Sequence, residues 1–401
     1  MEHIYLDYAA TTPVDARVMR VMQPYFSREF GNAGSVHSFG QAAIKAVDTA
    51  REIITKTIGA NFSEIIFTGS ASEANNLVLR GTLQYAKKIQ KEWVKPPRII
   101  VSAVEHESVL ATVQALSNYG IEVDIIPVNR GGVIDIKKLE AALAPETVLV
   151  SVMYANNEVG TVEPIAKIGK IIKEWRISHG QSDPLSPPFF HTDAVQAFQY
   201  LSCNVSELGV DLMTLSAHKI YGPKGVGALY ARLPALKSYR LVPQITGGGQ
   251  EYGMRSGTEN VPLIVGFSKA ADITTKIRDK EAKRVTALRD LFWREIKKIE
   301  SKAEVNGINI EEVKNERLPN NLNVYFPRHE AKFLLTKLDI LGLAASAGSA
   351  CSARSLEPSY VIDALGRSKE RAQKSIRFSL GRFTAKLEIQ RALSILKRAL
   401  V

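Results

Sequence analysis

Lys219 is the residue whose type and position most directly suggest chemistry. It lies in SAHKIYGPKG, residues 216–225, directly after an apolar run that predicts a buried strand. Open α/β sheets bind their ligands at the carboxyl ends of such strands. A lysine that is desolvated or near other cations loses proton affinity and can form a Schiff base as an amine nucleophile. Lys224 has an equal claim from position alone, and an ordinary solvated loop lysine is the alternative for both.

Asp193 follows a second apolar run in FFHTDAVQ, residues 189–196. An acid at a strand end can ligate a metal, orient a histidine or pair with a protonated ring nitrogen. Pairing with a pyridinium nitrogen is the role that an acid has in pyridoxal phosphate enzymes. Capping of a following helix by Asp193 explains the same residue equally well.

A phosphate site is suggested by EIIFTGSASEANN, residues 64–76, which combines a strand, a Gly/Ser turn and the start of a helix. The backbone N–H groups at a helix start bind anions, and the hydroxyls of Thr68, Ser70 and Ser72 can add to them. An ordinary helix capped by Ser70 or Ser72 fits the segment too.

His106 and Cys351 complete the candidate chemistry. His106, in AVEHES after a further predicted strand, can stack on a planar cofactor and relay protons, or it can be a polar surface residue. Cys351 lies in SAGSACSARSLEPSY, a loop of small residues in which Arg354 would favour the thiolate. The other cysteine, Cys203, is expected to be buried or half-buried. Two cysteines without paired spacing exclude a disulfide framework and a zinc site, so no metal is expected.

The elements that position these residues follow from short β-branched runs that alternate with helical patterns between residues 64 and 230. Several runs are nearly all apolar, as in strands covered on both faces. The alternation predicts right-handed crossovers and a mostly parallel sheet of about seven strands. The predicted strands are residues 64–68, 98–102, 122–127, 147–153, 189–193, 211–215 and 225–230, and helices are predicted at 72–89, 108–119 and 164–177.

The pattern changes after Pro262. A long amphipathic helix at residues 263–299 precedes strand-like runs at 321–326 and 375–380 and a closing helix from Lys386. This order predicts a separate, smaller α+β domain.

Composition limits the class of protein. The chain has 401 residues, 45% hydrophobic and 23% charged, which excludes a disordered or collagen-like protein. No stretch approaches the roughly 20 apolar residues that cross a bilayer, and residues 1–13 do not resemble a signal peptide, so we expect a cytoplasmic protein without membrane association. The net charge of +11 falls wholly within residues 265–401, because residues 1–264 carry 25 side chains of each sign. Solvated surface lysines and one basic region for a partner are the two explanations.

Taken together, these segments closely resemble the pyridoxal phosphate-dependent cysteine desulfurases of the NifS/IscS type. The match runs from YLDYAATTP at Tyr5 through FGNAGSVHSFG, FTGSASEANN, EHES, YANNEVG, HTDAVQ, SAHKIYGPKG, GGGQEYGMRSGT and SAGSACSA to SIRFSLGRFT at Thr384. The resemblance implies an α/β, aminotransferase-like large domain of fold type I at residues 16–264, with a mostly parallel seven-stranded sheet. It also implies a smaller α+β domain, formed by residues 1–15 and 265–401, that carries the cysteine loop.

The resemblance implies a role for each matching residue. Lys219 would bind pyridoxal phosphate as a Schiff base and later move the substrate's α-proton, and His106 would stack over the ring and assist proton transfer. Cys351 would take the sulfur of L-cysteine as a persulfide and leave L-alanine. The other implied positions are Asp193 for the pyridine nitrogen, Gln196 for the ring hydroxyl, Ala71, Ser72, Ser216 and His218 for the phosphate, Thr258 for the phosphate in the neighbouring subunit of a homodimer, and Asn156 for the cofactor and, with Arg377, for the substrate's carboxylate.

Two features depart from the family pattern. The phosphate turn reads TGSASEA where TSGATES is more usual, so the hydroxyl contact falls to Ser72. The chain stops at Val401, one amphipathic helix after SLGRF, where housekeeping members of the family continue with a tail that docks the iron–sulfur scaffold protein. The sulfur acceptor, an iron–sulfur scaffold or a tRNA-thiolation protein, is therefore left open. The basic last third of the chain predicts that the acceptor presents an acidic surface.

The alternatives are a selenocysteine lyase or an aminotransferase on the same scaffold, and a basic module that binds nucleic acid through residues 265–401. Cys351 argues against an aminotransferase, which needs no such thiol. The complete set of lysine, aspartate, histidine and cysteine argues against loss of catalysis, so direct nucleic-acid binding is not expected.

Overall fold

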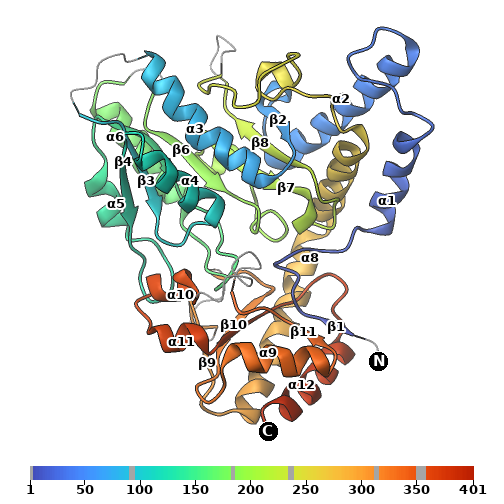
Figure 1. The fold of residues 1–401 in the computed structure, drawn as a ribbon, viewed down its shortest axis with the longest axis vertical. Helices are drawn as coiled ribbons and strands as arrows, with labels where there is room; N and C mark the ends of the chain where they lie inside the picture. The colour runs from blue at the N-terminus through green and yellow to red at the C-terminus, as the bar shows by residue number, and fades with distance from the viewer. Residues whose placement is uncertain (1–2, 90–94, 182–185, 234–238, 311–315, 349–357) are drawn as a thin grey trace.

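The computed structural model describes residues 3–89, 95–181, 186–233, 239–310, 316–348 and 358–401. Its largest feature is a seven-stranded sheet with the order β2-β8-β7-β6-β5-β3-β4, which confirms the predicted mostly parallel sheet (Figure 1). β8 runs antiparallel to its neighbours β2 and β7, and the pairs from β7 through β6, β5 and β3 to β4 are parallel. The strands are β2 Ile65–Thr68, β3 Arg98–Ser102, β4 Glu122–Ile126, β5 Thr147–Ser151, β6 Phe189–Asp193, β7 Leu212–Ser216 and β8 Gly227–Ala231.

Helices cover both faces of this sheet. Successive strand residues point to opposite faces, and Ile100 on β3 packs in one hydrophobic core while its neighbours Ile99 and Val101 pack in the other. Helices α3 and α4 cover the face of Ile99, and α2, α6 and α8 cover the face of Ile100. Both faces of the sheet are therefore covered by helices, which explains the nearly continuous apolar runs of the strands. The helices are α2 Ser38–Ile58, α3 Ala71–Ile89, α4 Glu107–Ser117, α6 Ile165–Ser178 and α8 Val261–Ile299.

Helix α8 connects the sheet to a second part of the molecule at the opposite end of Figure 1. The side chain of Asn260 caps its start by accepting a hydrogen bond from the backbone N–H of Leu263 at 3.3 Å. The helix continues without a break through residues 264 and 265, where the domain boundary is predicted, and the division into two domains stays a prediction. Neither α8 nor any other helix in the described part of the chain is long and apolar enough to span a membrane.

The second part contains two small sheets. Strands β12, β10 and β9 form an antiparallel sheet, and β1 from the N-terminus pairs in parallel with β11. The predicted strands at 321–326 and 375–380 are confirmed as β10 and β12, and the closing helix begins at Lys386 as predicted. The remaining elements are α1 Ala16–Met22, α5 Ile136–Ala142, α7 Val205–Leu208, α9 Ala331–Ile340, α10 Tyr360–Ala364, α11 Lys369–Gln373, α12 Lys386–Ala399, β1 Ile4–Tyr5, β9 Glu304–Val305, β10 Asn321–Tyr325, β11 Leu343–Ala344 and β12 Ser375–Ser379, with 3-10 turns at Gln23–Phe26, Phe62–Glu64, Ala217–Lys219 and Glu251–Gly253.

Candidate active site

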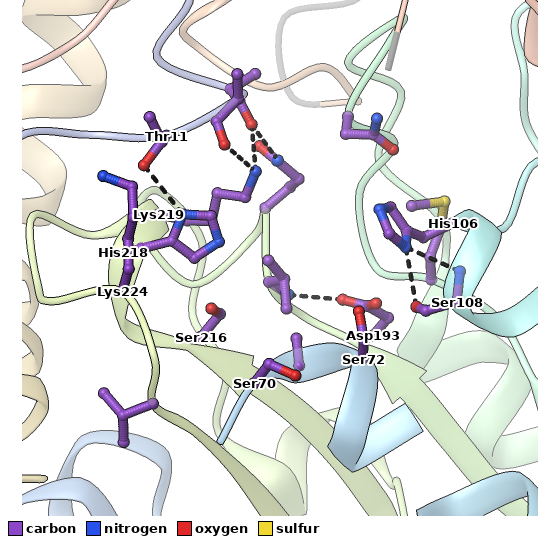
Figure 2. A pocket seen from close by; sticks show the side chains of 18 of the residues that line it. Thr11, Ser70, Ser72, His106, Ser108, Asp193, Ser216, His218, Lys219 and Lys224 are labelled. Atoms are coloured by element: carbon purple, nitrogen blue, oxygen red, sulfur yellow. Dashed lines mark hydrogen bonds between the residues drawn. The ribbon is translucent and has the colours of Figure 1, made fainter. Parts of the chain in front are cut away.

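A cavity of about 400 Å³ lies at the carboxyl ends of the parallel strands. Segments that follow β2, β3, β5, β6 and β7 form most of its wall, and β12 adds a residue from the second part of the molecule. Figure 2 shows Lys219, Asp193 and His106 on different sides of this cavity. The predicted site residues that line it are Ala71, Ser72, His106, Asp193, Gln196, Ser216, His218, Lys219 and Arg377.

Lys219 meets the N-terminal segment of the chain at the cavity wall. Its Nζ donates hydrogen bonds to the carbonyl oxygens of Ala9 at 2.6 Å and Ala10 at 2.7 Å. The side-chain amide of Gln196 donates to the same Ala9 carbonyl at 3.0 Å. The N-terminal segment therefore closes one side of the cavity and positions the amine of the lysine.

Asp193 ends β6, where it is buried and held in one orientation. One carboxyl oxygen, Oδ1, accepts from the backbone N–H of Val195 at 3.0 Å. The chain turns after Asp193 and the next helix begins only at Val205, so the alternative that Asp193 caps a following helix is wrong. The other, Oδ2, accepts from Nδ2 of Asn75 on α3 at 2.9 Å. Asp193 therefore lies on the cavity wall with one amide donor on each carboxyl oxygen. An acid held in this way can pair with a protonated ring nitrogen.

His106 caps helix α4 and also lines the cavity. Its Nδ1 accepts a hydrogen bond from the backbone N–H of Ser108 at 3.1 Å and lies 2.9 Å from the Ser108 hydroxyl. Because Nδ1 is an acceptor, a neutral imidazole carries its proton on Nε2. The cap thus fixes both the plane of the ring and its tautomer.

The turn before α3 has the geometry of an anion site. Ser70, Ala71 and Ser72 lie on the cavity wall at the N-terminus of this helix, which presents backbone N–H groups and partial positive charge. Gly227 on β8 packs directly against the turn. A Cβ on Gly227 would lie 2.9 Å from the carbonyl carbon of Ser70 and 3.0 Å from the nitrogen of Ala71, so only glycine lets the strand approach this closely.

Ser216 ends β7, His218 lies in the 3-10 turn that follows, and both line the same cavity (Figure 2). Nδ1 of His218 lies 3.1 Å from the Thr11 hydroxyl. Burial, together with the positive charges of Lys219 and Lys224, lowers the pKa of His218 from 6.5 to about 3. The imidazole is therefore neutral at pH 7 and donates from one ring nitrogen only.

Arg377 brings a guanidinium from β12 to the cavity wall. Its side chain is 1% exposed, and it donates from Nη2 to Asp7 at 2.8 Å and from Nη1 to the carbonyl of Asn157 at 3.0 Å. Its Nε is buried without a hydrogen-bond partner among the described residues. Guanidinium groups bind carboxylates through two parallel hydrogen bonds, so Arg377 can receive an acidic substrate group.

Asn156 holds a turn and does not lie on the cavity wall. Its Nδ2 donates to the carbonyl of Val104 at 3.0 Å, and its Oδ1 accepts from the backbone N–H groups of Glu158 at 2.8 Å and Val159 at 2.9 Å. The neighbouring Asn157 lines the cavity. The predicted contact of Asn156 with cofactor and substrate stays a prediction.

Thr258 and the two cysteines have different positions. Thr258 lies in a separate hollow of about 160 Å³, together with Gly69 and Arg255. Cys351 lies outside the described residues. Cys203 is fully buried, as predicted, and burial raises the pKa of its thiol to about 12, so it stays protonated at neutral pH.

Several residues that support the site are absent from the sequence prediction. Asn75 and Ser108 hold the acid and the histidine, and Asn75 also donates to the Ser108 hydroxyl at 2.8 Å. Asn75 lies three residues after Ser72 and so on the same helix face, a spacing that could have identified it. The carbonyls of Ala9 and Ala10 have no side-chain signal.

The cavity wall thus offers an amine, an acid, a flat imidazole, an anion-binding helix start and a guanidinium. An amine forms a Schiff base with an aldehyde, an acid pairs with a protonated ring nitrogen, and a helix start binds phosphate. The remaining guanidinium suits an amino-acid carboxylate. These residues therefore fit pyridoxal phosphate together with an amino-acid substrate.

Comparison with known proteins agrees with this fit. Residues 4–392 match the family Aminotransferase class-V. The chain is 45% identical over 395 residues to the cysteine desulfurase IscS of Dictyoglomus turgidum, across 98% of this chain and 94% of that protein. A solved NifS-like protein is similar with a TM-score of 0.87 and 34% identity, over 99% of both chains. A structure of SspA in complex with cysteine has a TM-score of 0.78 and 36% identity, over 95% of this chain and 100% of its own. The predicted aminotransferase-like fold is therefore confirmed.

Proposed function

The chain belongs to the Aminotransferase class-V family, and from this membership and the residues of the cavity we propose that it takes sulfur from L-cysteine and releases L-alanine. It is a pyridoxal phosphate-dependent cysteine desulfurase, as the resemblance implies. The observation that carries the proposal is the convergence of Lys219, Asp193 and His106 on one cavity beside an anion-binding helix start.

The cavity residues would hold the cofactor through its three kinds of polar group. When bound, pyridoxal phosphate withdraws electrons from the substrate's α-carbon and so stabilises the carbanion formed there. The carboxylate of Asp193 would keep the ring nitrogen protonated, because a negative charge favours the protonated form. Gln196 would meet the ring hydroxyl, and the phosphate would be bound by Ala71, Ser72, Ser216 and His218.

Lys219 and His106 would move protons at the reacting carbon atoms. Nζ of Lys219 would bind the cofactor, be displaced by the amino group of L-cysteine, and then take the proton from the α-carbon. His106 would stack on the ring and assist through Nε2, since Nδ1 is occupied by the helix cap. Arg377 would orient the substrate by its carboxylate.

Cys351 would receive the sulfur. Its thiolate forms a new S–S bond to the substrate sulfur, and the C–S bond of the substrate breaks. The electron pair of the broken bond stays with the substrate carbon, which takes up a proton and becomes the methyl group of L-alanine. L-cysteine and the enzyme thiol are thus converted to L-alanine and an enzyme persulfide without an external oxidant.

The assembly, location and acceptor are further parts of this proposal. A homodimer would let Thr258 of one subunit reach the phosphate of the other. We expect the enzyme to act in the cytoplasm and to pass its sulfur to an iron–sulfur scaffold or a tRNA-thiolation protein. The basic residues of the last third of the chain support an acceptor with an acidic surface.

The test measures alanine and sulfide from L-cysteine in the presence of a thiol reductant that releases the persulfide sulfur. We expect equal amounts of the two products from the wild-type enzyme and none from Cys351→Ser. Cys203→Ser is the matched control and should keep activity, because Cys203 is buried in the core. Transamination of pyruvate or 2-oxoglutarate without sulfide, or undiminished sulfide release by Cys351→Ser, would contradict the proposal. Assays with L-selenocysteine distinguish a selenocysteine lyase.

A further inference from the structure

Building on the function proposed above, we propose that Glu158 is a positioning residue for the sulfur-transfer step. Its carboxyl group accepts a hydrogen bond from Ser359 and faces Gly348, where an added Cβ would lie 3.2 Å from Oε2. Gly348 and Ser359 lie on either side of residues 349–357, which include Cys351. One buried side chain would thereby fix both ends of the segment that must present its thiol to the substrate sulfur.

The contact at the far end of the segment is a hydrogen bond. The hydroxyl of Ser359 donates to Oε2 of Glu158, and the same hydroxyl accepts from the backbone N–H of Ile362 at 3.2 Å, which caps α10. Glu158 is 1% exposed, and a hydrogen bond in such a dry environment is electrostatically stronger than one in water. Glu158 therefore fixes the start of α10.

The hydroxyl of Tyr360, the next residue, donates to the backbone carbonyl of Glu105 at 2.7 Å. Glu105 directly precedes His106 in the chain. The start of α10 is therefore held at two points, and one of these is on the loop that carries the cavity's imidazole.

The contact at the near end is with backbone. Gly348 has a φ of +133° and packs against the carboxyl group so closely that a Cβ would lie 3.2 Å from Oε2 of Glu158. Two residues earlier, Ser346 exchanges backbone hydrogen bonds with Arg377, at 2.6 and 3.2 Å, and its hydroxyl donates to Asp7 at 2.9 Å. The chain that leads into residues 349–357 is thus held first by the backbone of Arg377 and then lies beside Glu158.

Hydrogen bonds hold the backbone of Glu158 on both sides. Its backbone N–H donates to Oδ1 of Asn156 at 2.8 Å, and its carbonyl accepts from Nδ2 of Asn323 on β10 at 3.1 Å. The carbonyl of the preceding residue, Asn157, accepts from Nη1 of Arg377 at 3.0 Å. One turn after β5 therefore supports both the arginine that would bind the substrate's carboxylate and the two ends of the cysteine segment.

This arrangement predicts that loss of the Glu158 contacts affects sulfur transfer more than proton abstraction. Misplacement of reacting groups by about 1 Å can lower a rate by about 100-fold. The groups that abstract the α-proton are held by other contacts, namely the Ala9 and Ala10 carbonyls for Lys219 and the α4 cap for His106.

The experiment compares two reactions of the holoenzyme. Exchange of the α-hydrogen of L-alanine with deuterium from solvent reports proton abstraction, because alanine has no sulfur to transfer. Single-turnover formation of alanine from L-cysteine reports sulfur transfer. We expect Glu158→Ala and Ser359→Ala to slow alanine formation about 10- to 100-fold while alanine exchange stays within about 2-fold of wild type.

Three further variants sharpen the test. The double variant Glu158→Ala/Ser359→Ala should be no slower than Glu158→Ala, because the Ser359 hydroxyl acts through the Glu158 carboxyl group. Glu158→Gln keeps an acceptor oxygen for Ser359 and should restore most of the rate. Glu163→Ala removes another buried glutamate, whose carboxyl accepts from the backbone N–H of Ile134, and should not separate the two reactions.

An equal loss of both reactions in Glu158→Ala and Ser359→Ala, or an unchanged rate of alanine formation in both, would overturn the proposal. Independent, multiplying effects of the two substitutions would also overturn it. Failure of the wild-type enzyme to form alanine from L-cysteine would refute the proposed function instead, and the two failures are therefore distinguishable.

Discussion

Glu105 lies behind the cavity and should make the stability of this enzyme fall as pH rises. It is fully buried, and its Oε1 accepts from the Ser102 hydroxyl and the backbone N–H of Met153, each at 2.6 Å. Its Oε2 is buried with no hydrogen-bond partner among the described residues. Burial raises the pKa of Glu105 from 4.5 to about 8, against the opposing effect of these two hydrogen bonds. The carboxyl group is therefore protonated at pH 7.

The sign and size of the effect follow from the difference between the folded and unfolded chain. Between pH 4.5 and 8 the folded protein binds one proton more at Glu105 than the unfolded chain does, so the free energy of unfolding falls as pH rises. The stability from this residue is fully present below pH 4.5 and is lost as pH rises through 8. The slope within this window is about 1.4 kcal/mol per pH unit, which amounts to about 3 to 4 kcal/mol between pH 5 and pH 8.

The substitution Glu105→Gln isolates this effect, because glutamine has nearly the same shape and does not titrate. Urea unfolding of wild type and variant at pH 5, 6, 7 and 8 gives the difference in their free energies of unfolding at each pH. The free energy of unfolding of the variant, relative to that of wild type, should rise by about 3 to 4 kcal/mol from pH 5 to pH 8, whatever the difference at pH 5. Groups that do not interact with Glu105 titrate alike in both proteins, so their effect cancels in the comparison.

Glu140, which is exposed on α5, provides the matched control. Glu140→Gln makes the same change of side chain at a solvent-exposed position, and its difference from wild type at each pH is subtracted from that of Glu105→Gln. A constant difference between Glu105→Gln and wild type from pH 5 to pH 8 would refute the assignment of a buried, protonated acid to this position.

Three further substitutions test the packing and chemistry of the site. Gly227→Ala should force β8 and the Ala71 turn apart, lowering the free energy of unfolding by about 1 to 3 kcal/mol and weakening cofactor affinity in an absorbance titration of the apoenzyme; unchanged affinity would contradict the close approach. The buried Arg51 guanidinium lies 2.7 Å from the Glu251 carboxylate, and Glu251→Gln would leave it without an ionic partner. The substitution should therefore lower the free energy of unfolding, measured in urea, by about 3 to 5 kcal/mol. A loss below about 1 kcal/mol would count against that pair. Lys219→Ala should abolish deuterium exchange into L-alanine. It should also abolish the visible absorbance of the lysine–cofactor Schiff base, which in wild type survives dialysis. Persistence of both signals would exclude Lys219 as the cofactor lysine.

Much of the fold could be predicted from local pattern. Six strands of the large sheet are buried at nearly every residue, so their apolar runs stand out in the sequence, whereas the edge strand β4 is partly exposed. Each of the seven strands lies within two residues of its predicted bounds. Helix α2, Ser38–Ile58, is absent from the prediction although it is long. Its buried stripe includes Ala43, Val47 and Ala50, and small residues of this kind make a weak hydrophobic signal.

The sequence by itself determined which side chains could do chemistry and on which edge of the sheet they lie. Lys219, Asp193 and His106 each follow a predicted parallel strand, and parallel strands end at a common edge. That rule alone brings the three residues to one cavity, as the structure confirms. Their assignment as cofactor and catalytic residues rests on the resemblance and stays a prediction.

Only the tertiary structure decided what holds these groups in place. The amine of Lys219 bonds to the carbonyl of Ala9, 210 residues earlier in the chain, and Glu158 bonds to Ser359, 201 residues later. Asn156 supports the turn that carries Glu158 and does not line the cavity. Such contacts leave no local signal in the sequence, because every residue type has a backbone carbonyl. Residues about 200 positions apart are brought together only by the packing of the whole sheet. Strand ends are a local property of the chain, whereas the partners that meet there are a property of the fold.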